Sequence, residues 1–100
     1  MTDAEILEIM DTYPDTVAKA KEAWQLATAA RERTFARLYL TLKANSAEKK
    51  VTTEELKAKV RDSEEHFKAV QDEIMAESAY NLAYETLMSA KKQAGLRAAF

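Results

Sequence analysis

The side chains with the clearest chemical potential in this sequence are basic ones that recur at helical spacing. Arg33 and Arg37 are four residues apart, and that interval places both guanidinium groups on one face of a helix. Such a face can bind the phosphates of a nucleic acid, or it can be a solvated surface satisfied by ion pairs along the helix. The candidate nucleic-acid-binding residues are Arg31, Arg33, Arg37, Lys43, Lys57, Arg61, Lys91 and Lys92.

Catalytic and metal-binding chemistry has few candidate residues. The chain contains one histidine, His66, no cysteine and one glycine. One histidine without thiolates is a poor ligand set for transition metals, and a phosphate-binding glycine-rich loop needs several glycines. The Glu-x-x-His pattern of di-iron bundles is absent, because Ser63 stands three residues before the histidine. We therefore expect no enzyme activity, no cofactor and no metal.

The net charge of −2 is unevenly distributed along the chain. Residues 1–14 contain four acidic and no basic side chains, whereas residues 15–45 contain six basic and three acidic ones. A protein dedicated to nucleic acid usually has a more basic total. An alternative interpretation is an acidic inhibitor or adaptor that binds a host protein without nucleic acid. The side chains that would then mimic phosphates are Glu64, Glu65, Asp72 and Glu73.

The elements that carry these residues are predicted to be helices. One glycine and one proline leave the chain few residues that form turns, which indicates an all-α fold, and residues 1–100 are short enough for a single helical domain. Thr2 and Thr52 are typical helix-capping residues, and Pro14 is expected to separate a short first helix from a long second one. The expected helices span residues 3–11, 13–45 and 53–94.

The two longer helices are joined by a short polar segment, residues 46–52, which predicts a long antiparallel helical hairpin with a short N-terminal helix. The last helix would be roughly 60 Å long, and such a rod cannot bury its apolar side chains on itself. We therefore expect a helical-bundle homo-oligomer, a dimer or larger. The predicted interface residues are Trp24, Phe35, Leu38, Phe67, Val70, Ile74, Tyr80, Tyr84 and Leu87.

Arg31 occupies a seam position of the second predicted helix, between apolar neighbours at near-heptad spacing. Polar residues at such positions fix the register and the oligomeric state at some cost in stability. On this interpretation, replacing Arg31 with leucine raises the melting temperature and broadens the range of oligomers.

Three segments follow one another in a recognisable layout: ARLYLTLKA (36–44), VTTEELKAKVRDSEE (51–65) and ESAYNLAYETLMSAKKQAGLRAAF (77–100). This layout resembles small helical-hairpin proteins of bacteriophage recombination and replication gene clusters, and it is similar to the UvsY-type recombination mediators. The resemblance implies an oligomeric, non-enzymatic accessory protein that binds single-stranded DNA and a recombination protein. The basic residues at matching positions are Arg31, Arg33, Arg37 and Lys43.

The acidic N-terminus MTDAEILEIM is unlike a basic signal peptide, and no apolar run approaches the roughly 18 residues of a membrane span. We therefore expect a cytoplasmic protein without a membrane partner, in a bacterial host cell if the chain is encoded by a phage. The first functional hypothesis is an accessory protein of phage-type DNA recombination or replication. The host-protein adaptor is the alternative.

Overall fold

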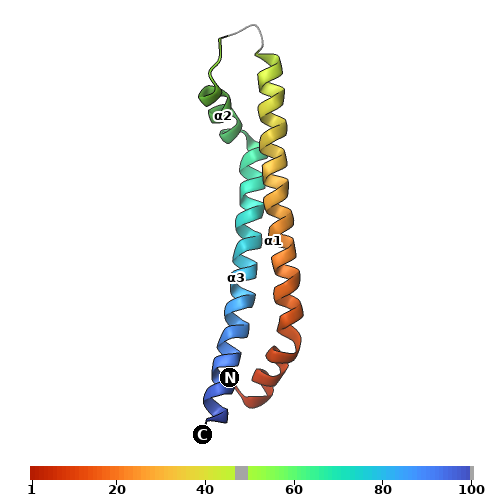
Figure 1. The fold of residues 1–100 in the computed structure, drawn as a ribbon, viewed down its shortest axis with the longest axis vertical. Coiled ribbons are helices and arrows are strands. Elements are labelled where there is room, and N and C mark those ends of the chain that lie inside the picture. The colour runs from red at the N-terminus through yellow and green to blue at the C-terminus, as the bar shows by residue number, and fades with distance from the viewer. Residues whose placement is uncertain (47–49, 100) are drawn as a thin grey trace. The chain divides into compact units, whose positions relative to one another are not determined.

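The computed structural model describes residues 1–46 and 50–99, and helices account for most of them (Figure 1). Within these ranges there are three helices and no strand: α1 (Asp3–Asn45), α2 (Thr53–Arg61) and α3 (Glu64–Ala98). The predicted all-α fold is therefore confirmed. Residues 47–49 of the predicted connecting segment lie outside the described residues.

Contacts within the chain group it into two compact units. The first unit combines Met1–Trp24 with Met75–Phe100, and the second unit is Gln25–Ile74. In each unit, a segment of α1 lies antiparallel beside a segment of α3 (Figure 1). This arrangement confirms the predicted antiparallel pairing of long helices.

The predicted helix break at Pro14 is wrong, because α1 continues through this residue. Proline lacks the amide hydrogen that would bond to the carbonyl of Met10, and its ring crowds that carbonyl. A helix of 43 residues tolerates the loss of one hydrogen bond, and proline usually bends such a helix. Figure 1 shows the red, N-terminal part of α1 changing direction. The separate helix predicted at residues 3–11 is thus the beginning of α1.

The single helix predicted at residues 53–94 is also wrong, because it divides into α2 and α3. Ser63 starts the second of these helices. Its Oγ accepts a hydrogen bond from the amide of His66 at 3.2 Å and donates one to the carbonyl of Val60 at 2.6 Å. Two glutamates follow in the first turn of α3, where the helix dipole favours acidic side chains.

The sequence predicts that the last helix ends at residue 94, because Gly95 follows, and this prediction is wrong. Glycine ends a helix when it adopts the left-handed conformation, and Gly95 has no positive φ. A Cβ atom at this position would meet nothing within 4 Å, so no close packing requires a glycine there. α3 therefore continues to Ala98, with Arg97 in its last turn.

The start of α1 has the predicted capping box. The amide of Glu5 donates to Thr2 Oγ1 at 3.2 Å, and the Thr2 hydroxyl donates back to the Glu5 carboxylate at 3.0 Å. The hydrogen bond from the Thr2 hydroxyl to the carboxylate, together with one from the Thr2 amide at 3.4 Å, holds the pKa of Glu5 below its ordinary value. Arg97 of α3 pairs with Asp3 beside this cap, so the first unit is also closed by an ion pair.

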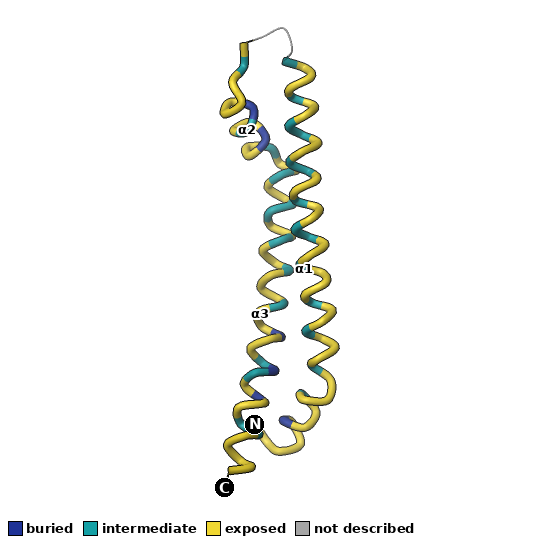
Figure 2. Tube along the Cα trace, viewed as in Figure 1, coloured by how far each residue is buried: buried dark blue, intermediate teal, exposed yellow. Residues whose placement is uncertain are grey.

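The first unit buries a narrow core between α1 and α3 (Figure 2). Trp24 stacks on Tyr80 with 5.4 Å between ring centroids, and Tyr80 stacks on Tyr84 at 5.9 Å. Two of the four buried side chains of this core are alanines of α3, which occupy little space between the helices. The buried residues of the unit are Ile6, Ala83, Leu87 and Ala90.

The second unit buries Leu56 and Val60 of α2. Thr52 caps this helix as predicted, since its Oγ1 accepts a hydrogen bond from the amide of Glu55 at 3.1 Å. The α1 and α3 segments of the unit meet through aromatic side chains, with Phe35 lying edge-on to the His66 ring at 5.5 Å. Among the described residues, the second unit therefore has two buried apolar side chains, against four in the first unit.

Candidate functional site

The second unit has a groove between α1 and α3, with a volume of about 520 Å³. Its floor is apolar and contains Leu26 together with Ala27, Ala30 and Ala69. The lining is completed by Thr34 of α1 and by three charged residues of α3, which are Glu65, Lys68 and Asp72. A groove floored by alanines between two antiparallel helices has the geometry that accepts a further helix at close range.

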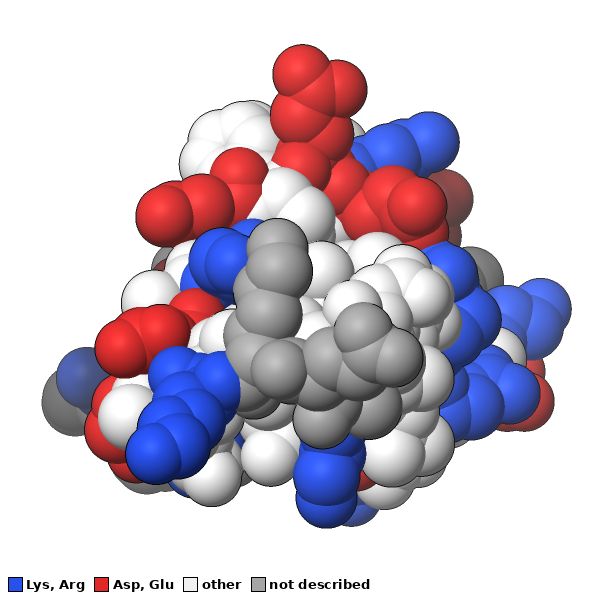
Figure 3. Space-filling model, turned by 90° about the horizontal axis from the view of Figure 1, so that it is seen from above, with Lys and Arg blue, Asp and Glu red and all other residues white. Residues whose placement is uncertain are grey.

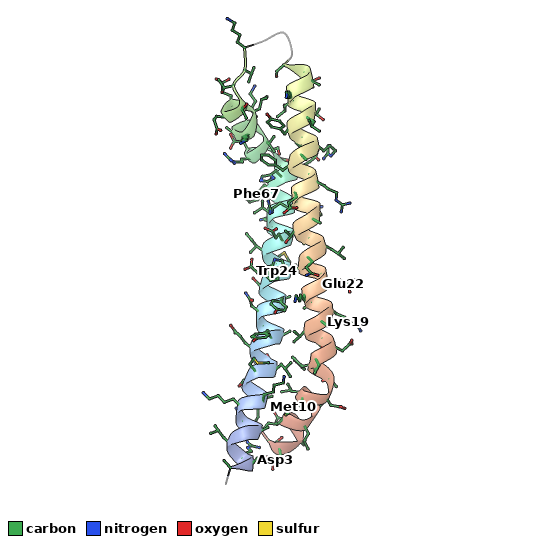
Figure 4. The ribbon with its side chains drawn as sticks, in the orientation of Figure 1. Asp3, Met10, Lys19, Glu22, Trp24 and Phe67 are labelled. Atoms are coloured by element: carbon green, nitrogen blue, oxygen red, sulfur yellow. The ribbon has the colours of Figure 1, made fainter. Side chains whose placement is uncertain are left out.

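Large apolar side chains also lie exposed on both helices of this unit. On α1, Leu26 is 61% exposed and Leu40 is 62% exposed, with Arg33 midway between them. The spacing of seven residues places all three on one face of the helix. On α3, Phe67 is 60% exposed (Figure 4), and Ile74, seven residues later, is 54% exposed. Exposed apolar side chains at helical spacing are typical of helix-binding surfaces.

The predicted interface residues fall into three groups. Phe67, Ile74 and Tyr84 are exposed and available to another chain. Trp24 and Tyr80 instead pack against each other inside the first unit, where Leu87 is buried. The remaining three are partly buried within the second unit: Phe35, Leu38 and Val70.

Arg31 occupies the seam as predicted, and it is paired within the chain. Its Nε donates to the Glu73 carboxylate at 2.8 Å, and the two side chains are 30% and 19% exposed. This hydrogen bond, with a smaller contribution from Thr28, holds the pKa of Glu73 below its ordinary value of 4.5 despite partial desolvation. The guanidinium group is therefore engaged in the seam and is a weak candidate for binding phosphate.

The other predicted basic residues differ in how far they are neutralised. Arg37 forms an ion pair with Glu65 across the second unit, and Lys57 Nζ lies 4.0 Å from Glu54 Oε1 on its own helix. Lys43 is exposed at the end of α1. Of the eight predicted residues, those that are exposed and have no ion pair in the described part of the chain are Arg33, Lys43, Arg61, Lys91 and Lys92.

The structure does not gather these eight residues into one basic stripe. Lys91 and Lys92 belong to the first unit, and the six others belong to the second. Figure 3 shows acidic and basic side chains beside one another on the face it presents. The acidic residues considered as phosphate mimics are likewise divided, because Glu65 and Glu73 are paired with arginines whereas Glu64 and Asp72 are exposed.

His66 is half-buried against Phe35, and its Nδ1 atom is buried without a hydrogen-bond partner in the described part of the chain. No group of three or more His, Cys, Asp or Glu side chains that could hold a metal ion occurs among residues 1–46 and 50–99. The observed role of His66 is thus an aromatic contact in the seam.

The sequence indicated Glu73 only as a phosphate mimic and not as the partner of Arg31, and it did not indicate Ala30 or Ala69 as site residues. Glu73 is separated from its partner Arg31 by 42 positions, so the pair depends on the register of α1 against α3. An acid at helical spacing from Val70 and Ala76 was the available signal, since the inward face of α3 contains all three. The alanines of the groove gave no signal, because alanine is common on every helix face.

No helix in the described ranges is both long enough and apolar enough to cross a membrane. Comparison with protein-family models, with curated proteins and with solved structures finds no match to this chain. The resemblance to phage recombination mediators therefore stays a prediction.

Proposed function

We propose that this chain is a non-enzymatic accessory protein that works by assembling with other protein chains, beginning with copies of itself. The observation that carries this proposal is the exposure of Leu26, Leu40, Phe67 and Ile74, each more than half accessible on a helix of the second unit. Large apolar side chains that are exposed at helical spacing are typical of interaction sites in water-facing proteins. Association would remove these side chains from water.

The molar mass of the full chain in solution tests self-assembly. We expect sedimentation equilibrium to give a whole multiple of the 11.3 kDa chain mass at micromolar concentration. The reason is that apolar burial favours association by roughly 25 cal/mol per Å² of surface removed from water. A mass of one chain at every concentration up to the millimolar range would contradict the proposal.

A second candidate function is binding of single-stranded DNA, as in the accessory proteins of phage recombination. It is favoured by five of the predicted basic residues, which are exposed and have no ion pair in the described part of the chain: Arg33, Lys43, Arg61, Lys91 and Lys92. The pairing of Arg31 and Arg37 with carboxylates weakens it, since those two residues were half of the set matching the mediators.

Fluorescence anisotropy of a labelled oligothymidine tests this second function. If DNA binds, affinity falls steeply with salt, because each neutralised phosphate releases a counterion. Lys91→Glu/Lys92→Glu is then expected to weaken binding about tenfold or more at low salt. The matched control is Lys19→Glu/Lys21→Glu, which changes the charge equally on α1, where Lys19 is already paired with Asp15 at 2.9 Å. Equal affinity of the two variants, or no binding at low salt, would contradict DNA binding at this cluster.

A further inference from the structure

We propose that the groove of the second unit is the site of self-association, and that its occupant is the α1 helix of a second copy of this chain. This inference rests on the proposed function and gives the assembly a location. The two copies would be related by a two-fold axis near Ala30, with their α1 helices antiparallel. Each groove would then receive the exposed face of the other copy's α1, making a four-helix contact.

The accessible surface area of the chain is larger than that of a compact monomer of the same mass, which supports coverage by a protein partner. The chain exposes 7451 Å². A compact monomer of 11.3 kDa exposes about 5,700 Å², so the excess is about 1,700 Å². Permanent homodimers bury about 2,000–5,000 Å² in total, or roughly 1,000–2,500 Å² on each chain. The excess matches what each chain of such a dimer removes from water.

The groove lining contains two carboxylates, Glu65 and Asp72, and one lysine, Lys68, so its net charge is opposite in sign to that of Arg33. Arg33 is exposed on α1 without an ion pair in the described part of the chain, and Asp72 lines the groove, also without one. About an axis at Ala30, the second copy's Arg33 lies opposite Ala27, since both are three residues from Ala30. That position is on the groove floor, within the same lining as Asp72. The arginine of each copy can therefore pair with the aspartate of the other.

The small side chains of the groove floor suit this close approach. Ala27 and Ala30 project only a methyl group, so two α1 helices can pack with little separation between their backbones. The aliphatic part of Leu26, which is 61% exposed, would be covered in the same step. Each chain supplies both a groove and the helix that fills the other copy's groove. A two-fold contact therefore fills both grooves and forms a closed dimer.

The first test uses the absence of cysteine from the natural chain. Ala30→Cys places a single thiol beside the proposed axis, so mild oxidation is expected to link most of the protein into covalent dimers. Ala36→Cys is the matched control: it is another exposed alanine of α1 in the same unit, but it does not line the groove. It is expected to cross-link at least tenfold more slowly.

The second test reverses the proposed intermolecular charge pair. Arg33→Glu is expected to raise the dimer dissociation constant about tenfold or more, and adding Asp72→Arg is expected to restore most of the lost affinity. Circular dichroism of each variant checks that the helices remain folded. Rescue by the double reversal requires the two positions to meet, which a loss of folding cannot imitate.

The outcomes separate this inference from the function on which it rests. If the unmodified chain is monomeric at all concentrations, self-assembly itself fails. If it is oligomeric but Ala30→Cys and Ala36→Cys cross-link equally, and the charge reversal has no effect, the groove is not the interface. In that case the assembly uses another face, and the exposed Phe67 and Ile74 are the next residues to replace.

Discussion

Leu87→Ala is expected to lower the free energy of unfolding by about 3 kcal/mol, which is within the usual range for truncating a buried leucine. Leu87 is 5% exposed and lies in the narrow core of the first unit, with buried alanines on the neighbouring turns of α3. The few buried side chains there cannot readily refill the space of three lost carbon atoms. Thermal unfolding monitored by circular dichroism should show a melting temperature lower by more than about 10 °C.

Leu82→Ala is the control for this prediction, because it makes the same substitution five residues earlier on α3. Leu82 is 68% exposed, so its truncation is expected to change the stability by less than about 0.5 kcal/mol. Equal destabilisation by the two variants would show that α3 does not pack against α1 in the orientation described. It would place Leu82 in a contact between chains.

The second large effect concerns the seam pair, where Arg31→Leu is expected to lower the melting temperature by several degrees. The sequence alone had suggested the opposite sign, because it showed an arginine among apolar residues without a partner. The structure supplies Glu73 as that partner at 2.8 Å, so the single substitution leaves a half-buried carboxylate unpaired. The double variant Arg31→Leu/Glu73→Leu removes both charges and is expected to restore or exceed the original melting temperature.

The pH dependence of the same pair follows from the lowered pKa of Glu73. The pKa of the Glu73 carboxylate in the folded chain lies below its ordinary value of 4.5. The ion pair therefore contributes fully to stability above pH 4.5. The contribution is lost as the pH falls through the lowered pKa. The difference in melting temperature between the natural chain and Glu73→Gln should therefore shrink between pH 7 and pH 3. A difference that stays constant over this range would show that the carboxylate is not engaged by Arg31.

Much of the fold could be predicted from the sequence, because helix caps and turn-forming residues act locally. Thr2 and Thr52 were recognisable as caps from their own neighbours, and both make the expected hydrogen bonds. The wrong predictions concern where helices begin and end. They arose because the preference of a single residue depends on the helix around it. Pro14 lies far enough inside α1 for the surrounding turns to hold it in the helix, and Ser63 resembled an ordinary helix-surface residue until its two hydrogen bonds were visible.

Less of the candidate site could be predicted, because it depends on which residues of two distant segments meet. The basic side chains were visible in the sequence, but their neutralisation by Glu65 and Glu73 depends on register. The groove is invisible in the sequence for the same reason: Ala30 and Ala69 line one surface only once α1 and α3 are paired. Composition specified the class of fold, and the pairing of the helices determined which side chains remain available.

The helix break at Ser63 has a consequence for how the protein opens. It leaves α2 with 9 residues, fewer than the roughly 12–15 that an isolated helix needs in water. The helical state of α2 therefore depends on the burial of Leu56 and Val60, and its backbone amides can be protected from solvent exchange only while those two side chains stay packed. Without the break, α2 would be an extension of α3 and would be held by that longer helix. With the break, α2 folds and unfolds together with the packing of Leu56 and Val60.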